Sequence, residues 1–324
     1  MNESSLDLKK ICSGIHTVGI AGHVRPDGDA VGACLALQQY LQTVNPQIRA
    51  DVFLEAPPSK FSLLKGFDRI LDASSCSQVY DLFFALDIAD RSRLGTAERL
   101  FSSSRETVCI DHHISNTGFA GHNLIVPTAS STCEVLTGLM DDAFITTDTA
   151  MCLYLGIVHD TGVFRHSCTL PETMETAARL MRKGFNANRI INETYYDKTF
   201  NENRVMGAAL SRSERFLEDS LIFSYITMQD MRLYQVTPAG LDGIVQNMMS
   251  TVGVETAVFL YEAEPESWKV SFRSRERVDV SRICRSFGGG GHIRAAGCNL
   301  SGTIESVRNT VLKAVEDQLR QVSC

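Results

Sequence analysis

The sequence lacks the features that mark several large classes of protein. It has no hydrophobic run long enough to span a membrane, no low-complexity tract and no repeat of solenoid period. Its ten cysteines stand singly, with no pair at two-residue spacing, which argues against a zinc knuckle and a small disulfide framework. Residues 1–10 lack the basic start and apolar stretch of a secretory signal. We therefore expect a globular protein of the cytoplasm, with reduced thiols and no membrane partner.

An excess of positive charge is also absent. The formal net charge of −7 opposes the binding of long polyanions, so we expect no long duplex nucleic acid as a partner. Residues 273–294 are an exception, because arginines gather there, although a solvated surface would explain this cluster equally well by itself. A length of 324 residues with 44% hydrophobic content is enough for two domains of unequal size.

Apolar runs and helical periodicity alternate along the first part of the chain. Four runs are apolar along their length, as in strands that are buried on both faces: 17–23, 50–54, 82–86 and 107–110. Apolar residues at helical spacing predict helices at 29–41, 131–140, 148–158 and 172–183. Residues 1–187 are therefore predicted to form an α/β domain with a doubly wound, mainly parallel sheet and helices on both faces.

The pattern changes after residue 187. Residues 188–218 are a long polar stretch of helical character, which we interpret as a connector. Residues 219–324 predict a smaller mixed α+β domain. Its expected elements are a strand at 221–228, a helix at 241–250, a hairpin around 264–267, a helix at 280–286, a glycine run and a final helix at 304–322.

One imidazole and two carboxylates follow the first predicted strand. His23, Asp27 and Asp29 lie within seven residues, at a turn between that strand and the next helix. Open α/β sheets bind their ligands at the carboxyl ends of the strands, so these side chains are candidates for a site. An ordinary turn, in which Asp27 or Asp29 caps the helix, is the alternative interpretation.

Further acids and imidazoles follow the third and fourth predicted strands. Asp87 comes directly after the run 82–86, with Asp90 as its competitor, and either residue could instead be a helix cap. Asp111, His112 and His113 follow the fourth strand. Two adjacent histidines point in different directions, so one of them can bind metal while the other faces a substrate.

A fourth segment places Asp160 at the end of a predicted helix. A carboxylate is disfavoured at the negative end of a helix unless a cation lies nearby. The four segments together offer carboxylates and imidazoles but no thiolate, which suits manganese first, with magnesium or cobalt as alternatives. A bridging carboxylate can hold two such ions about 3.5–4 Å apart, where they bind a shared hydroxide and polarise a phosphoryl oxygen.

In this order and spacing the segments resemble the DHH phosphoesterases, a family named for a triplet such as Asp111-His112-His113. The resemblance covers nearly the whole chain. Residues 287–297, Phe-Gly-Gly-Gly-Gly-His-Ile-Arg-Ala-Ala-Gly, are similar to the glycine motif of the DHH-associated substrate domain. The resemblance implies a two-lobed hydrolase with its cleft between the domains.

The resemblance also implies a role for each candidate residue. His23, Asp27 and Asp87 would hold one manganese ion. Asp29, Asp87, His112 and Asp160 would hold the other, with Asp87 as the bridge. His113 would contact the scissile phosphate or the leaving oxygen, and Asp111 would orient the histidines. Substrate phosphate would be bound by residues of the second domain: Arg273, Ser274, Gly288, Gly289, Gly290, Gly291, His292 and Arg294.

Size and domain pairing resemble the oligoribonuclease branch of the family, the nanoRNases, which also act on 3′-phosphoadenosine 5′-phosphate. The leading hypothesis is therefore hydrolysis of short oligoribonucleotides, dinucleotides included, to mononucleotides. One alternative is a nucleotide phosphatase, or an inorganic polyphosphate or pyrophosphate hydrolase, with the same metals. Another is a nucleotide-binding regulator without catalysis, although the full ligand set argues against it. The expected partners are short RNA or nucleotides, and a homodimer is left open.

Overall fold

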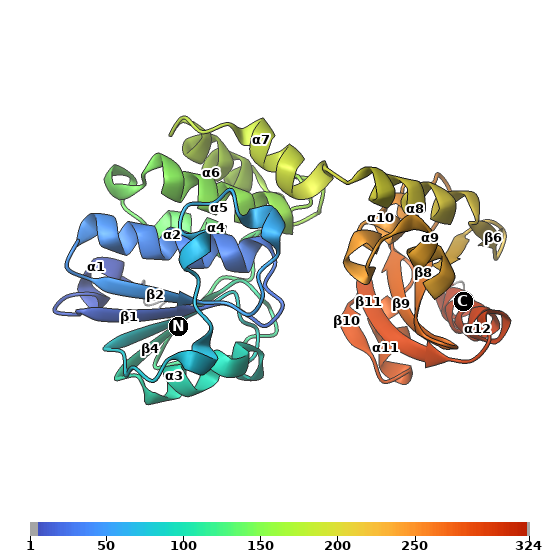
Figure 1. The fold of residues 1–324 in the computed structure, drawn as a ribbon, viewed down its shortest axis with the longest axis horizontal. Helices are drawn as coiled ribbons and strands as arrows, with labels where there is room; N and C mark the ends of the chain where they lie inside the picture. Colours follow the sequence, from blue (N-terminus) through green and yellow to red (C-terminus); the bar gives the residue numbers. More distant parts are fainter. Residues whose placement is uncertain (1–5, 323–324) are drawn as a thin grey trace. The chain divides into compact units, whose positions relative to one another are not determined.

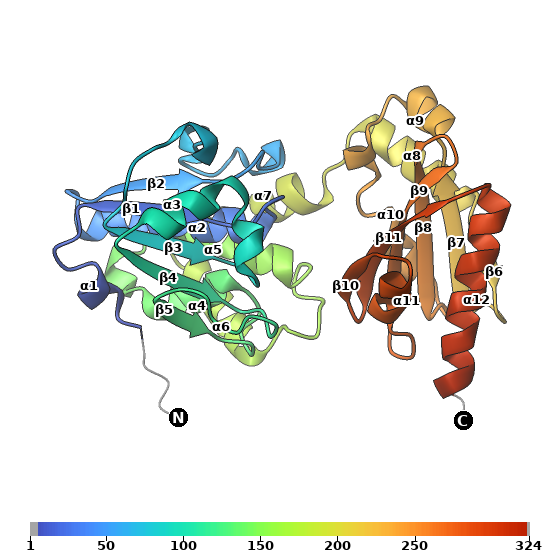
Figure 2. The ribbon, with the colours of Figure 1, turned by 90° about the horizontal axis from the view of Figure 1, so that it is seen from below.

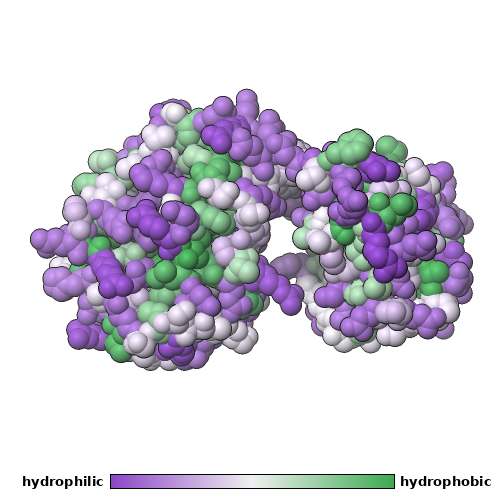
Figure 3. Space-filling model, viewed as in Figure 1, coloured by the Kyte–Doolittle hydropathy of each residue, from purple (hydrophilic) through white to green (hydrophobic). Residues whose placement is uncertain are grey.

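The computed structural model describes residues 6–322 of the chain. Contacts within the chain divide it into two compact units, Met1–Asp197 and Lys198–Cys324, and each is described by itself (Figure 1). Hydrophilic side chains predominate on the face drawn in Figure 3, with smaller apolar patches between them. None of the described helices is both long and apolar enough to cross a membrane.

A five-stranded sheet forms the centre of the first unit, and all its strand pairs are parallel. The strands are β1 (Thr17–Ala21), β2 (Arg49–Phe53), β3 (Leu82–Leu86), β4 (Glu106–Asp111) and β5 (His122–Ile125). Their order is β2-β1-β3-β4-β5, so the chain leaves β1 toward one side of the sheet and returns on the other. The carboxyl ends of β1 and β3 therefore meet at a topological switch point, where open sheets bind ligands.

Helices cover both faces of this sheet, as predicted (Figure 2). The helices of this unit are α1 (Leu8–Ile11), α2 (Gly28–Val44), α3 (Glu98–Ser103), α4 (Thr132–Leu139), α5 (Thr147–Asp160), α6 (Pro171–Met181) and α7 (Ala187–Ile191). On one face, Ile20 and Phe84 pack in a core with residues of α2, α4 and α5. On the other face, Phe83 packs with Phe101 of α3. Burial of each such side chain contributes about 1.5–3 kcal/mol to stability. This arrangement of a parallel sheet between helices confirms the predicted α/β fold.

Two glycines let α2, α4 and α5 pack unusually closely. A Cβ atom at Gly32 of α2 would lie 2.5 Å from the backbone oxygen of Cys152 in α5. A Cβ atom at Gly156 of α5 would lie 2.3 Å from Sγ of Cys133 and 2.6 Å from Oδ1 of Asp29. Gly32 therefore allows α2 to approach the backbone of α5, and the absence of a side chain at Gly156 makes room for the Asp29 carboxylate.

The second unit contains a six-stranded mixed sheet with the order β10-β11-β9-β8-β7-β6. The strands are β6 (Glu214–Phe216), β7 (Leu221–Ile226), β8 (Thr256–Glu264), β9 (Ser267–Ser274), β10 (Gly290–His292) and β11 (Ala295–Ser301). Only the β7–β8 pair is parallel among these strands. The helices are α8 (Phe200–Ser211), α9 (Met228–Tyr234), α10 (Ile244–Met249), α11 (Val280–Ser286) and α12 (Ile304–Val322).

Each face of the second sheet has its own core. Helices α11 and α12 cover the face that carries Val270 and Phe272, and α8 and α10 cover the face that carries Ala257 and Phe259. This is the mixed α+β arrangement that was predicted, and α11 and α12 have the predicted bounds.

Some elements differ from the prediction. The stretch 188–218 does not stand apart from the two units, because α8 buries Val205 and Ala209 in the second core. Its first part, α7 and the π-helical turn η6 (Asn192–Tyr196), belongs to the first unit. The helix predicted at 241–250 is divided into a 3₁₀ turn, η7 (Pro238–Leu241), and α10, because Gly243 has a φ of +84° between them.

Candidate metal centre

Asp87 lies at the end of β3, with a backbone conformation that is uncommon for a residue other than glycine. Its φ is +58° and its side chain is buried. A non-glycine residue held in the left-handed region costs of order 1 kcal/mol or more, and such strain clusters at functional sites. The turn aims the carboxylate at histidines from two other strand ends. Oδ2 lies 3.6 Å from Nε2 of His23, and Oδ1 lies 3.6 Å from Nε2 of His112.

In the turn after β1, the two carboxylate oxygens of Asp27 make different contacts. Its Oδ1 atom accepts hydrogen bonds from the backbone N–H groups of Asp29 and Ala30, and so caps the N-terminus of α2. Its Oδ2 atom lies 3.7 Å from Nε2 of His23. Desolvation is the largest influence on the pKa of Asp27 and would raise it, but the hydrogen bond and charge of His23, together with the backbone N–H groups of α2, lower the pKa to about 2. The two interpretations of this segment are therefore compatible, because one oxygen caps the helix while the other faces the cluster.

The N-terminus of α4 holds the carboxylate of Asp29. Oδ2 accepts a 2.6 Å hydrogen bond from the backbone N–H of Thr132, and Oδ1 accepts a 3.0 Å bond from that of Cys133. Asp29 is fully buried, and desolvation is the main cause that raises its pKa. The sequence prediction did not include this helix in the site.

The Asp111-His112-His113 triplet begins at the last residue of β4, and both histidines bring a ring nitrogen close to Oδ1 of Asp87, Nε2 of His112 at 3.6 Å and Nδ1 of His113 at 3.7 Å. Asp111 is fully buried, and its Oδ1 atom accepts a 2.7 Å hydrogen bond from Nδ1 of His113. Its Oδ2 atom accepts a 2.8 Å bond from Asn116, a buried residue that also donates to the backbone oxygen of Ile88. Asp111 therefore orients its neighbours from behind the ligand cluster.

His112 and Asp160 form the fourth part of the cluster. Nε2 of His112 lies 3.0 Å from Oδ2 of Asp160, the last residue of α5. Burial tends to lower the pKa of His112, but the hydrogen bond with Asp160 and the charge of Asp29 raise it to about 9. Desolvation and the charge of Asp29 raise the pKa of Asp160 to about 7, despite the bond with His112.

Negative charge is concentrated around Asp87. Desolvation and the charges of Asp29 and Asp27 raise the pKa of Asp87 well above its usual range. Several carboxylates this close together cannot all remain ionised without a compensating cation. Three groups of ligand atoms in this cluster lie within 4.8 Å of one another: His23, Asp27 and Asp87; Asp87, His112 and His113; and Asp29, His112 and Asp160. The structure thus brings together the residues predicted to hold metal.

Asp90 and His159, two other polar residues near this edge of the sheet, form contacts that stabilise local structure and do not join the ligand cluster. Asp90, the competitor of Asp87, is exposed and caps the 3₁₀ turn η4 (Arg91–Ala97). Nε2 of His159 lies 3.0 Å from the hydroxyl of Thr194, and its ring packs against Phe61. The cysteines that the structure describes are all free thiols.

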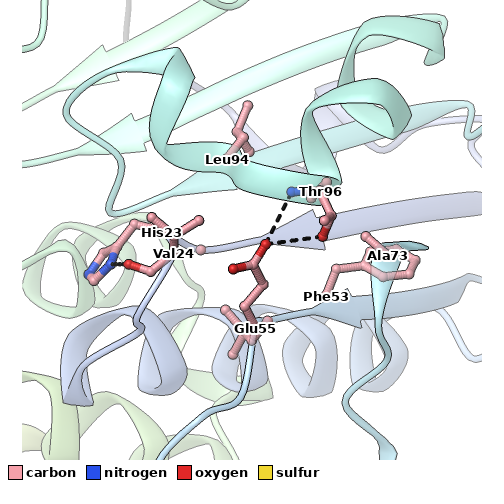
Figure 4. A pocket seen from close by; sticks show the side chains of 10 residues that line it. His23, Val24, Phe53, Glu55, Ala73, Leu94 and Thr96 are labelled. Atoms are coloured by element: carbon pink, nitrogen blue, oxygen red, sulfur yellow. Dashed lines mark hydrogen bonds between the residues drawn. The ribbon is translucent and has the colours of Figure 1, made fainter. Parts of the chain in front are cut away.

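Two cavities lie beside the turn after β1. The first, next to His23 and Val24, has a volume of about 10 Å³, which is roughly enough for one water molecule (Figure 4). Its wall is held together by Glu55, which accepts hydrogen bonds from the backbone N–H and the hydroxyl of Thr96. The second is an open depression of about 290 Å³ that is lined in part by Arg25 and Glu55. Only the second has room for part of a substrate.

The predicted substrate residues of the second unit gather at one end of β9, β10 and β11. The strand register places His292 opposite Ala295, and Ala295 opposite Arg273. Ser274 is turned to the buried face, where its hydroxyl donates a 2.7 Å hydrogen bond to the backbone oxygen of Val278. The neighbours Arg273 and Ser274 therefore face opposite sides of the sheet.

Three more of the residues predicted to bind substrate, Arg294, Gly288 and Gly289, form hydrogen bonds within the second unit. Arg294 donates to the same backbone oxygen of Val278 through Nη1. In the glycine run, the N–H of Gly288 donates to the backbone oxygen of Arg285, and that of Gly289 donates to Cys284. The resemblance implied that Gly288 and Gly289 bind substrate phosphate, but their N–H groups close the end of α11 instead.

Three residues with contacts to the cluster were not predicted from the sequence. Thr132 donates its hydroxyl to Oδ1 of Asp87 at 3.2 Å. Asn116 holds Asp111, and Nη2 of Arg93 lies 3.1 Å from Nδ1 of His23. A hydroxyl or amide carries no sequence signal for such a role unless its spatial neighbours are known.

Two protein-family models match the sequence. The model described as "DHH family, N-terminal domain" matches residues 17–157, and the "DHHA1 domain" model matches residues 219–321. The chain is 29% identical over 304 residues to the bifunctional oligoribonuclease and PAP phosphatase NrnA of Thermus thermophilus, covering 93% of this chain and 89% of that protein. It is 25% identical over 310 residues to the protein of the same name from Bacillus subtilis, covering 93% of this chain and 95% of that protein.

A solved structure shows the same fold. An exopolyphosphatase-related protein from Bacteroides fragilis superposes with a TM-score of 0.89 at 24% identity, covering 98% of this chain and 96% of that chain. Proteins of one fold host different activities, so the chemistry must be argued from the cluster around Asp87.

Proposed function

The chain belongs to the DHH family, and we propose that it hydrolyses short oligoribonucleotides, dinucleotides included, to mononucleotides with two divalent cations. 3′-Phosphoadenosine 5′-phosphate is the second substrate of the proposal. The names of the two NrnA relatives support both activities, since each relative is matched over most of its length.

Asp87 carries the proposal. Its Oδ2 atom faces His23, which lies beside Asp27, while its Oδ1 atom faces His112, which lies beside Asp160. One carboxylate thus presents its two oxygens to two separate sets of ligands. A carboxylate placed in this way could bridge two cations at the separation of about 3.5–4 Å that two-metal phosphoesterases use.

The donor set fits such cations. It consists of carboxylate oxygens and imidazole nitrogens, a combination suited to manganese, with magnesium or cobalt as alternatives. The carboxylates of Asp29 and Asp87 are buried, and desolvation together with the charge of Asp29 raises the pKa of Asp87. Positive charge held between them would remove the repulsion and keep both groups ionised.

Cations bound at these ligands would lower the pKa of a water molecule and polarise a phosphoryl oxygen. The protein side chains would then align the reacting phosphate. His113, held by Asp111 at 2.7 Å, would contact the scissile phosphate or the leaving oxygen. Asp27 and Asp29 would remain fixed during the reaction, because their oxygens are bound to backbone N–H groups of α2 and α4.

Substrate length would be set by a small number of phosphate contacts. The net charge of −7 disfavours long nucleic acids, whereas a local pair such as Arg273 and His292 can bind one phosphate. In this proposal Ser274 and Arg294 support the loop around Val278, since both donate to its backbone oxygen.

A direct comparison of substrates tests the proposal. The full chain with Mn²⁺ would be given a diribonucleotide, a long RNA strand, 3′-phosphoadenosine 5′-phosphate and polyphosphate, and the products would be separated by chromatography. We expect mononucleotides from the dinucleotide at the highest rate, and no product with Asp87→Asn. Degradation of long RNA or polyphosphate without cleavage of the dinucleotide would overturn the proposal, and the second of these results would favour the polyphosphate hydrolase.

A further inference from the structure

Thr132, the first residue of α4, contacts two of the buried carboxylates in the cluster. Its backbone N–H donates a 2.6 Å hydrogen bond to Oδ2 of Asp29, and its hydroxyl donates a 3.2 Å bond to Oδ1 of Asp87. Thr132 is fully buried, and so is Asp29. The two carboxylates lie far apart in the sequence, so one residue of α4 links the ends of α2 and β3.

Both contacts of Thr132 lie on the same side of the cluster. Oδ1 of Asp87, which accepts the hydroxyl, also lies 3.6 Å from Nε2 of His112 and 3.7 Å from Nδ1 of His113. Asp29 shares a ligand group with His112 and Asp160. The opposite oxygen of Asp87, Oδ2, is the one that faces His23. Thr132 therefore contacts the ligand atoms on the His112 side of the cluster and not those on the His23 side.

We propose that Thr132 is a positioning residue for the cation on the His112 side alone. The inference rests on the two-cation function proposed above. A carboxylate oxygen accepts about two hydrogen bonds or metal bonds, so a hydroxyl that occupies one direction at Oδ1 leaves the other for a cation.

Backbone groups of α4 support this role. The N–H groups of Thr132 and Cys133 bind one oxygen each of Asp29, at the positive end of the helix. They would persist when the side chain of Thr132 is changed. Substitution of the hydroxyl therefore isolates the contact with Asp87, while Asp29 keeps its backbone partners.

A matched set of variants separates this contact from packing. Thr132→Val keeps the shape and removes the hydroxyl, and Thr132→Ser keeps the hydroxyl. Thr137→Val is the control, because Thr137 lies in the same helix, is also fully buried, and donates its hydroxyl to the backbone oxygen of Cys133. Asp27→Asn is the comparison variant for the His23 side.

Calorimetric titration of Mn²⁺ into the metal-free full chain gives the readout. The wild-type chain should bind two ions. In Thr132→Val the affinity of one ion should fall about 10- to 100-fold, the usual effect of removing an outer partner of a ligand, while the other ion is unaffected. Thr132→Ser and Thr137→Val should match the wild type. Asp27→Asn should lower the affinity of the ion on the His23 side. The double variant Thr132→Val/Asp27→Asn should therefore bind both ions more weakly.

Each outcome bears on a different claim. Equal weakening of both ions in Thr132→Val, or two unchanged ions, would overturn the role of Thr132 and leave the two-cation proposal intact. Fewer than two ions in the wild type would overturn both. If circular dichroism shows that Thr132→Val is unfolded, Thr132→Ala removes the same hydroxyl with a smaller side chain. The same fall in the affinity of one ion is then expected.

Discussion

Nδ1 of His113 donates a 2.7 Å hydrogen bond to Oδ1 of Asp111, a carboxylate with no exposure to solvent. The same oxygen accepts the backbone N–H of His112, and the other oxygen accepts Asn116. Both oxygens of this carboxylate are thus used to hold the triplet and the loop that follows it.

The first prediction concerns this bond. Asp111→Asn keeps the shape of the side chain but removes the charge that orients His113. Turnover of a dinucleotide should fall about 10- to 100-fold, with a smaller change in KM. Asp72→Asn, at an exposed cap of a 3₁₀ turn, is the control and should leave kcat unchanged. Unchanged turnover in Asp111→Asn would show that His113 needs no orientation from this carboxylate.

The second prediction concerns removal of metal ligands. Asp87→Ala and His112→Ala should abolish turnover while the circular dichroism spectrum stays native. Without metal, Asp87→Ala should unfold at the same temperature as the wild type or higher, because it removes a buried carboxylate that its neighbours repel. Mn²⁺ at 100 times its Kd should stabilise the wild type by about 2.7 kcal/mol for each ion bound, and the variants by much less.

Thermal unfolding with chelator and with Mn²⁺ measures this difference. Asp90→Asn is the control, because Asp90 caps an exposed turn three residues beyond Asp87. Equal stabilisation of Asp87→Ala and the wild type by Mn²⁺ would contradict the assignment of Asp87 as a ligand.

The third prediction concerns Arg273. A charge-assisted bond to phosphate contributes about 1.5–3 kcal/mol, so Arg273→Ala should raise KM about 10- to 100-fold and change kcat little. Arg215→Ala is the matched control, since Arg215 is an exposed arginine of the same unit, paired with Asp219. Steady-state kinetics on the dinucleotide measures both constants. A loss confined to kcat would place Arg273 in the chemical step instead.

The fourth prediction concerns the glycine run. A Cβ atom at Gly289 would lie 2.2 Å from the backbone oxygen of Gly297, whereas one at Gly290 would meet no atom within 4 Å. Gly289→Ala should therefore lower the free energy of unfolding by about 1–3 kcal/mol through overpacking, and Gly290→Ala should not. Denaturant unfolding of both variants measures this. Equal effects of the two substitutions would mean that the close approach to β11 is not what requires glycine.

Strong local patterns made most of the fold predictable. β3 has the predicted bounds because Leu82–Leu86 is apolar throughout and buried on both faces. Strand β5 was missed, since His122 and Asn123 are exposed polar residues at an edge of the sheet. Helix α5 ends at Asp160, as the fourth segment predicted, although the helical spacing of apolar residues alone placed its end at Val158, since local hydrogen bonds that composition does not specify set helix ends.

The ligand residues could be predicted because each follows a strand or ends a helix of one parallel sheet. The residues that hold them could not. Thr132 contacts Asp87 across 45 positions of sequence and Asp29 across 103, so no spacing rule connects them. The same holds for Gly288 and Gly289, because the partners of their N–H groups are carbonyl groups of α11 that no spacing rule indicates.

Crystals of the full chain grown with Mn²⁺ would test the bridging role of Asp87 most directly, through anomalous scattering at the manganese edge. The account predicts two peaks about 3.5–4 Å apart, one beside His23 and Asp27 and one beside His112 and Asp160, with an oxygen of Asp87 on each. A single peak, or two peaks of which one does not contact Asp87, would contradict it.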